Sequence, residues 1–115
     1  MQITVLKSKI HRATVTGADL NYEGSISIDK KLMNVASIAL YELVQVVNLN
    51  NGERFETYAI EEAAGSGQVQ LNGPAARLGQ VGDLIIILSY CLIPSSDATT
   101  IKPIIVKVDS KNKQI

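Results

Sequence analysis

The 115-residue chain has no tryptophan and one phenylalanine, and aromatic residues make up only 4% of it. Its 46% of hydrophobic residues is therefore mostly aliphatic, which favours a β-rich core of branched side chains. A single cysteine, Cys91, excludes an internal disulfide and has no partners at metal-ligand spacing. We expect Cys91 to be a small core hydrophobe and the protein to hold no metal.

The sequence also lacks net charge, since eleven basic residues balance eleven acidic ones. This excludes the basic surface typical of nucleic-acid binders. The longest apolar run, residues 84–88, extends with interruptions to Ile93 and is well short of the ~20 residues that span a membrane. Residues 1–7 do not resemble a secretion signal. We expect one cytoplasmic domain over residues 1–115, without nucleic-acid or membrane partners.

Alternating apolar and polar residues predict a mainly β protein. Strands are expected over residues 3–8, 10–16, 43–49, 53–60, 68–71, 84–93 and 104–108. Asn50, Asn51 and Gly52 tolerate the positive φ of a tight turn and join two of these strands into a hairpin. Seven or so short strands with few helices indicate a small closed or nearly closed β-barrel.

Local signals also predict the connections. Asp29 is placed to cap a short helix over residues 30–36, and Pro74 to open a helical turn after Asn72 and Gly73. The Gly-Ser-Gly at residues 65–67 is interpreted as a turn, because no helix with Lys-Ser or Lys-Thr follows it as in a phosphate-binding loop. The polar tail from Ser110 is expected to fray.

The most informative segment is residues 22–29, which contains the pair Gly24 and Ser25 in the loop that follows the first strands. Glycine exposes its carbonyl carbon to close approach, and the neighbouring serine hydroxyl can attack that carbon to convert the amide to an ester. β-Elimination of the ester leaves dehydroalanine, which hydrolyses to ammonia and a pyruvoyl group. Most Gly-Ser pairs are ordinary turns, so the surrounding sequence decides between the two interpretations.

The surrounding sequence has three motifs, at residues 9–25, 51–60 and 71–76. In their order and spacing they resemble the pyruvoyl-dependent aspartate 1-decarboxylase family, and the resemblance runs from Lys9 to about Val108. It implies a double-psi β-barrel with a few short helices, assembled as a homotetramer with active sites between neighbouring subunits. It also implies cleavage into a β chain, residues 1–24, and an α chain, residues 25–115.

The resemblance implies an activity as well. The pyruvoyl group made from Ser25 would form a Schiff base with L-aspartate and accept the electrons left by CO₂, giving β-alanine for pantothenate synthesis without an external cofactor. Thr57 would assist cleavage by stabilising the oxyanion at Gly24 and would line the substrate site. Tyr58 would protonate the substrate carbon, since a phenol keeps its proton at neutral pH. Adjacent strand residues face opposite ways, so both serve one site only if the strand twists or bulges, or if they serve neighbouring sites.

Further residues are implicated in substrate binding. Arg54 can hold a carboxylate with its guanidinium fork, and we expect it to grip the retained side-chain carboxylate, because gripping the leaving one would stabilise the ground state. In the family, Lys9 and His11 contribute to the substrate site, and their spacing places them on one face of a strand. The resemblance also implies that backbone groups of Asn72, Gly73 and Ala75 approach the ligand. Pro74, where many relatives have alanine, has no N–H to donate.

Without the family resemblance, each of these residues has an ordinary structural interpretation. A strand threonine or tyrosine is usually packed, an arginine is usually solvated, and a histidine usually has a structural partner. Two alternatives therefore stay open: a double-psi barrel that binds a partner without chemistry, and the same chemistry on glutamate. The sequence does not say whether a helper protein accelerates cleavage.

Overall fold

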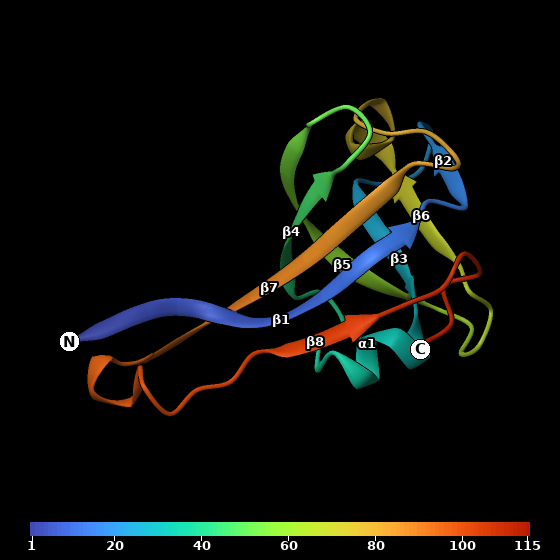
Figure 1. Ribbon diagram of the computed structural model, residues 1–115. Helices are drawn as coiled ribbons and strands as arrows, with labels where there is room; N and C mark the ends of the chain where they lie inside the picture. The colour runs from blue at the N-terminus through green and yellow to red at the C-terminus, as the bar shows by residue number, and fades with distance from the viewer.

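Eight strands, one α-helix and two 3₁₀-helices make up the computed structural model, which describes residues 1–115 (Figure 1). The strands are β1 (Gln2–Thr14), β2 (Gly17–Asp19), β3 (Ser25–Asp29), β4 (Leu43–Asn48), β5 (Arg54–Glu62), β6 (Val69–Asn72), β7 (Leu84–Pro94) and β8 (Ile104–Lys107). The helices are α1 (Lys30–Val35), η1 (Gly73–Arg77) and η2 (Ser95–Asp97). The expected mainly β fold is confirmed. The five expected strands from residue 43 onward are found with ends shifted by one or two residues, the two expected before residue 17 are one strand, and β2 was not expected.

The strands form one sheet in the order β2-β6-β3-β5-β4-β7-β1-β8. The chain leaving β1 closes this sheet, because Thr16 bonds to Val69 of β6 at the opposite end. The Thr16 amide donates to Val69 O at 2.8 Å, and the Val69 amide donates to Thr16 Oγ1 at 2.9 Å. Closure leaves few exposed sheet edges. It encloses a core of 19 buried hydrophobic residues that includes Ile10, Ile26, Ile28, Leu71, Ile85 and Ile87.

Asp29 caps α1 as the sequence indicates. Its carboxylate accepts from the Lys31 amide at 2.8 Å, and also from the amides of Gly65 and Gly67, each at 2.9 Å. Burial raises the pKa of Asp29, but these backbone hydrogen bonds outweigh burial and lower it from its ordinary value. Residues 65–67 are thus a turn fastened to the start of a helix. At six residues, α1 is far too short to cross a membrane, and the structure has no longer helix.

A long arm formed by β1 and β7 projects from the barrel, with η2 at its tip (Figure 1). The sequence predicted two strands here, but β1 is continuous and bends at two register shifts, one at Lys7 and one near Arg12, which has φ 64°. Cys91 lies on this arm and is half-buried, so the prediction of a core position was wrong. The arm cannot enclose a core of its own.

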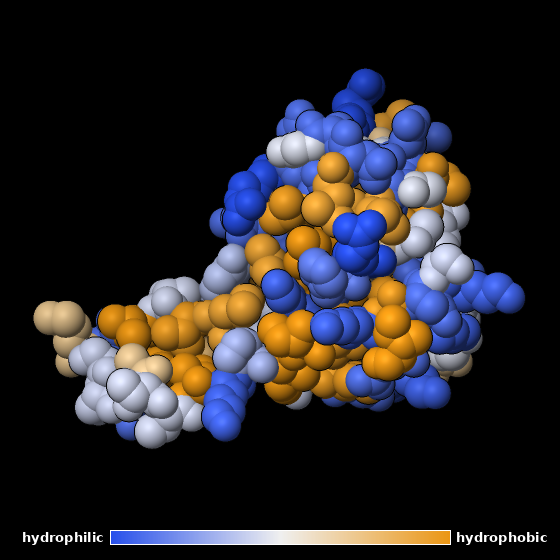
Figure 2. Space-filling model, in the orientation of Figure 1, coloured by the Kyte–Doolittle hydropathy of each residue, from blue (hydrophilic) through white to orange (hydrophobic).

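Apolar side chains are exposed on the arm and the strands beside it (Figure 2). They include Tyr90 (42% exposed), Leu92 (64%), Ile104 (38%) and Ile105 (42%). Apolar residues gathered in this way are characteristic of a surface that another protein covers.

The C-terminal tail does not fray. Asn112 is 1% exposed and fills a gap between β1 and the turn at residues 65–67. Its Oδ1 accepts from the Thr14 amide, and its Nδ2 donates to Thr14 O and Gly67 O, all at 2.8 Å. Its φ of 60° lies in the left-handed region that asparagine tolerates. The prediction failed because a polar composition does not reveal a buried amide that satisfies the backbone of two other segments.

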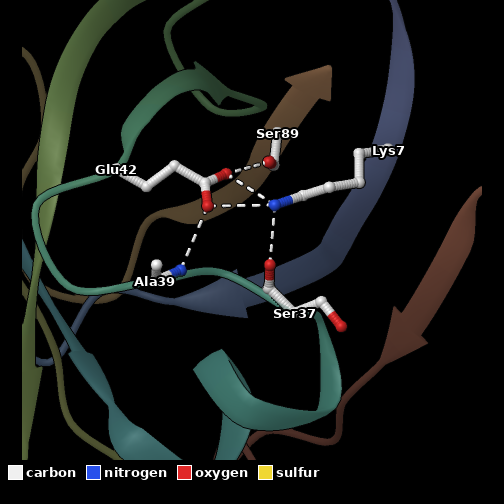
Figure 3. Close-up of polar contacts among 5 residues, drawn as sticks. All are labelled: Lys7, Ser37, Ala39, Glu42 and Ser89. Atoms are coloured by element: carbon white, nitrogen blue, oxygen red, sulfur yellow. Dashed lines mark hydrogen bonds and ion pairs between the residues drawn. The ribbon is translucent and has the colours of Figure 1, made fainter. Parts of the chain in front are cut away.

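A polar cluster fastens the arm to the loop between α1 and β4 (Figure 3). Lys7, the residue displaced by the first register shift, directs Nζ to both carboxylate oxygens of Glu42 at 2.9 Å and to Ser37 O at 2.7 Å. The Glu42 carboxylate also accepts from the Ala39 amide at 3.1 Å and from Ser89 Oγ. Burial raises the pKa of Glu42, but these donors outweigh burial and lower it from its ordinary value.

We predict that Asn112→Ala lowers the free energy of unfolding by about 2–4 kcal/mol, since it leaves buried backbone groups without partners and puts alanine at a positive φ. Thermal denaturation measures the effect. Lys111→Ala, next to it and exposed, is the matched control and should leave the midpoint unchanged. An unchanged midpoint in Asn112→Ala would mean that the tail contributes nothing to stability.

We predict a pH-dependent loss of stability in Glu42→Gln. A carboxylate with a lowered pKa stabilises the fold above its ordinary pKa of 4.5 and loses this effect as the pH falls through the lowered value. Glu42→Gln should therefore be less stable by about 1–2 kcal/mol at pH 7, and the difference should shrink in acid. Melting curves across this pH range test it. Glu53→Gln, at an exposed carboxylate, is the control; a constant deficit in Glu42→Gln would contradict the prediction.

Candidate active site

The Gly24–Ser25 bond lies at the point where a loop becomes a strand. Gly24 belongs to the loop that follows β2, as the sequence indicated, whereas Ser25 is already the first residue of β3. Ser25 pairs with Asn72 in the antiparallel ladder of β3 and β6, and its side chain is 1% exposed. The bond thus joins a loop residue to a buried serine in a strand.

The Ser25 hydroxyl has two polar neighbours. Its Oγ accepts from Asn72 Nδ2 at 2.9 Å and lies 3.3 Å from Glu23 O, to which the hydroxyl donates. Asn72 is fully buried, and its Nδ2 donates a second bond to Ser27 Oγ at 2.8 Å. Sequence reasoning assigned backbone contacts to Asn72, but the structure gives its side chain the direct contact with Ser25.

The turn that follows Asn72 packs against the loop that contains Tyr22 and Gly24. Gly73 has φ 63°, and a Cβ built on it would lie 2.8 Å from Tyr22 O and 2.9 Å from Gly24 Cα. Only glycine permits so close an approach of two backbone segments at a positive φ. Pro74 Cδ lies 3.4 Å from a Cβ built on Gly24. The turn at 73–75 therefore packs on the bond expected to break.

A pocket of about 340 Å³ opens beside this bond. It brings together five of the sequence-predicted site residues. Its lining is Gly24, Phe55, Glu56, Thr57, Tyr58, Pro74, Ala75 and Leu78. Residues that are more than thirty positions apart in the chain therefore meet where the chemistry was expected.

Thr57 and Tyr58 both line this pocket although they alternate in burial along β5. The pairing of β5 explains this. β3 pairs with β5 only from Ile26 opposite Ala59 onward, so the edge of β5 before Ala59 has no strand partner on that side. The Gly24 loop lies against that edge instead, and both residues reach the pocket from one subunit.

Tyr58 is also contacted by Tyr41, with ring centroids 6.2 Å apart and planes inclined by 57°. Tyr41 has φ 69°, and its amide donates to Ala59 O at 2.7 Å, which ties its loop to β5 next to Tyr58. Glu42 follows directly, so the Lys7–Glu42 cluster of Figure 3 holds this loop in place. Sequence reasoning missed Tyr41; its position in a loop carried no periodic signal.

Arg54 lies at the start of β5, outside the pocket lining. It is exposed, and its Nη2 is 3.4 Å from Gln45 Oε1, which also accepts from Tyr90 OH at 2.9 Å. Arg54 lies four positions before Tyr58, which is ~13 Å along an extended chain. The guanidinium has no carboxylate partner and is free to bind an anion.

Lys9 and His11 share one face of β1, as their spacing predicts, but they do not join the pocket. Two strands, β4 and β7, separate β1 from β5 in the sheet. His11 Nδ1 is buried without a hydrogen-bond partner. Burial lowers the pKa of His11, and the neighbouring charges of Lys9, Arg12 and Lys107 lower it further. His11 is therefore harder to protonate than an ordinary histidine.

Two more residues near Ser25 were missed by sequence reasoning. Gln70 Nε2 donates to Asn72 Oδ1 at 2.8 Å, and Ser27 accepts from Asn72 as described above. The sequence did contain a signal. Polar residues alternate with apolar ones in both Ser25–Asp29 and Val69–Asn72, in strands that are otherwise buried.

Known proteins share the sequence of this chain over almost its whole length. The family described as aspartate decarboxylase matches residues 1–115. An aspartate 1-decarboxylase of Caldicellulosiruptor saccharolyticus is 62% identical over 113 residues, which cover 98% of this chain and 88% of that protein. One from Thermoanaerobacter pseudethanolicus is 56% identical over 115 residues, covering 100% of this chain and 98% of that protein.

Among solved structures, a rationally designed double-psi β-barrel protein matches with a TM-score of 0.50 and 15% identity. The match covers 69% of this chain and 91% of that chain. At this identity the likeness concerns the fold alone, and it confirms the double-psi β-barrel that the sequence predicted.

Proposed function

This chain belongs to the aspartate decarboxylase family, and we propose that it converts L-aspartate to β-alanine and CO₂ with a pyruvoyl group made from its own Ser25. The enzyme is a carboxy-lyase that supplies pantothenate synthesis, which we place in the cytoplasm. Cleavage between Gly24 and Ser25 would yield chains of residues 1–24 and 25–115. The observation that carries the proposal is that Gly24, Thr57 and Tyr58 line one pocket.

Cleavage begins with attack of Ser25 Oγ on the Gly24 carbonyl carbon. Oγ forms the new bond, the Gly24 carbon releases the Ser25 nitrogen, and the product is an ester. Elimination then expels the Gly24 carboxylate. Holding the hydroxyl beside its own peptide is worth ~7–11 kcal/mol as effective concentration. An oxyanion donor adds ~3–4 kcal/mol, and Thr57, in the same pocket, is the candidate donor.

The surroundings of Ser25 fit a pyruvoyl group. Asn72 Nδ2 supplies a hydrogen-bond donor where the group would form. Gly73, which has no side chain, leaves room for the loop that contains Gly24. A pyruvoyl ketone would supply a sink for the electron pair left on the substrate carbon when CO₂ departs, which is the role that other enzymes give to an external cofactor. No metal or added cofactor is part of the proposal.

Tyr58 donates the proton that replaces the lost carboxylate on the substrate carbon. Its hydroxyl-bearing ring lines the pocket and is held by Tyr41. Ala75 and Gly73 keep backbone N–H groups near the substrate, whereas Pro74 has none to offer. Thr57 completes the pocket wall on the same strand.

Lys9, His11 and Arg54 lie outside this pocket in one subunit, which supports a site completed by a neighbouring subunit. We propose a homotetramer in which the three residues hold the carboxylates of L-aspartate, with Arg54 on the side-chain carboxylate. The exposed apolar residues on β7 and β8 support such an assembly (Figure 2).

We predict that purified protein contains fragments of 24 and 91 residues, the larger without a free N-terminal amine. Ser25→Ala should remain a whole chain of 115 residues, since it lacks the attacking hydroxyl. Intact-mass spectrometry distinguishes these species. Ser96→Ala, at an exposed serine of η2 at the tip of the arm, is the matched control and should still be cut. Recovery of active protein with an unbroken chain would contradict the proposal.

We predict that Tyr58→Phe is cut normally but releases β-alanine about 10²–10⁴-fold more slowly, because it retains the ring and loses the proton donor. The measurement is β-alanine and CO₂ formation from aspartate, with glutamate assayed in parallel to test the choice of substrate. Tyr90→Phe, which also loses a strand hydroxyl but lies outside the pocket, serves as the control. Full activity in Tyr58→Phe would assign the proton transfer to another group.

A further inference from the structure

We propose that Gln70 is a positioning residue for self-cleavage, which orients the Asn72 amide so that Asn72 holds the Ser25 hydroxyl ready to attack. The inference rests on the proposed cleavage between Gly24 and Ser25. Gln70 belongs to none of the motifs described above, and it touches neither Ser25 nor the pocket lining.

Four polar side chains lie on one face of the β3–β6 ladder. Ser25 pairs with Asn72, and Ser27 pairs with Gln70, in antiparallel register. Residues two apart in a strand share a face, so these four are neighbours. The alternate residues, Ile26 and Ile28 of β3 and Leu71 and Val69 of β6, are fully buried in the hydrophobic core.

The hydrogen bonds within this group use every donor of the Asn72 amide. One Nδ2 hydrogen goes to Ser25 Oγ at 2.9 Å and the other to Ser27 Oγ at 2.8 Å. Asn72 Oδ1 accepts from Gln70 Nε2 at 2.8 Å. Because Asn72 is fully buried, water does not provide alternative partners. A donor at Gln70 therefore favours the orientation in which the amide nitrogen faces the two serines.

This orientation matters for the chemistry of Ser25. A hydroxyl that accepts from Asn72 must direct its own hydrogen elsewhere, and Glu23 O lies 3.3 Å away. The remaining lone pair of Oγ is then available for the Gly24 carbonyl carbon. If the Asn72 amide turned over, its oxygen would face Ser25 and accept the hydrogen bond of the hydroxyl, which would then no longer donate to Glu23 O.

Gly17 provides an independent reason to assign this role to Gln70. Gly17 pairs with Gln70 in the parallel ladder of β2 and β6, and a Cβ built on it would lie 2.6 Å from Gln70 Oε1 and 3.1 Å from Gln70 Cδ. The absence of a side chain at Gly17 leaves the space that the Gln70 amide occupies. β2 is thus shaped around the side chain that orients Asn72.

The test follows cleavage of freshly translated full-length chain by intact-mass spectrometry at several pH values. Gln70→Glu places a carboxylate, which only accepts, where an amide donated. We expect it to reverse the Asn72 amide and to slow cleavage about tenfold at neutral pH. At acid pH a protonated Glu donates again, so its rate relative to that of the original chain should recover. Gln70→Met should be slow at every pH.

Gln68→Glu is the matched control, because it adds the same charge at an exposed position that precedes β6 and should be cut at the original rate at each pH.

Gly17→Ala is a second way to disturb the Gln70 amide. The added methyl group displaces the flexible Gln70 amide, so cleavage should slow about tenfold with Gln70 itself unchanged. Circular dichroism checks that each variant is folded.

The outcomes separate the two proposals. If the original chain stays whole, the proposed cleavage is wrong. If it is cut while Gln70→Met, Gln70→Glu and Gly17→Ala are cut equally fast, cleavage stands and the role of Gln70 is wrong. Slowing of Gln70→Glu that is the same at every pH would mean that Gln70 acts only by packing, which also overturns the role proposed here.

Discussion

The antiparallel pairing of β3 with β6 is the constraint on which the site depends. It puts Ser25 opposite Asn72 and so buries a nucleophile beside the amide that contacts it. It also brings the turn at Gly73, which follows β6, against the loop that precedes β3. β3 in turn pairs with β5 only from Ala59 onward, which leaves the edge at Thr57 and Tyr58 open to form a pocket. A shift of this register by one residue would turn Ser25 to the opposite face and disconnect all of these contacts.

The caps and turns of the fold were predictable from the sequence, because a few adjacent residues determine each of them. The Asp29 cap, the hairpin turn at Gly52 and the turn at residues 65–67 each follow from the conformational preferences of a few adjacent residues. The errors concern features that only tertiary structure decides. β1 is one strand because register shifts let it bend without ending, and Asn112 is buried because distant backbone groups require an amide there. β2, three residues without an alternating pattern, exists only through its pairing with β6.

The candidate site divides in the same way. Family resemblance named Gly24, Thr57, Tyr58, Pro74 and Ala75, and the fold brings all five to one pocket. It also named Lys9, His11 and Arg54, which lie outside that pocket in one subunit. β4 and β7 separate Lys9 and His11 from it, and Arg54 lies at the far end of β5. Asn72 was named for its backbone, yet its side chain makes the contact with Ser25. Gln70 was missed because a glutamine in a short strand looks like an ordinary exposed position until its partner is known.

The position of β1 has a consequence for the lifetime of the protein. β1 pairs with β7 along its whole length and with β8 on its other side, and it belongs to the first 24 residues. If the chain is cut between Gly24 and Ser25 as proposed, the central strand of the arm is no longer covalently joined to the barrel that surrounds it. Refolding would then require two separate molecules to find each other, whereas the uncut chain folds by itself. A cut protein would therefore persist through a slow rate of unfolding rather than through a reversible equilibrium.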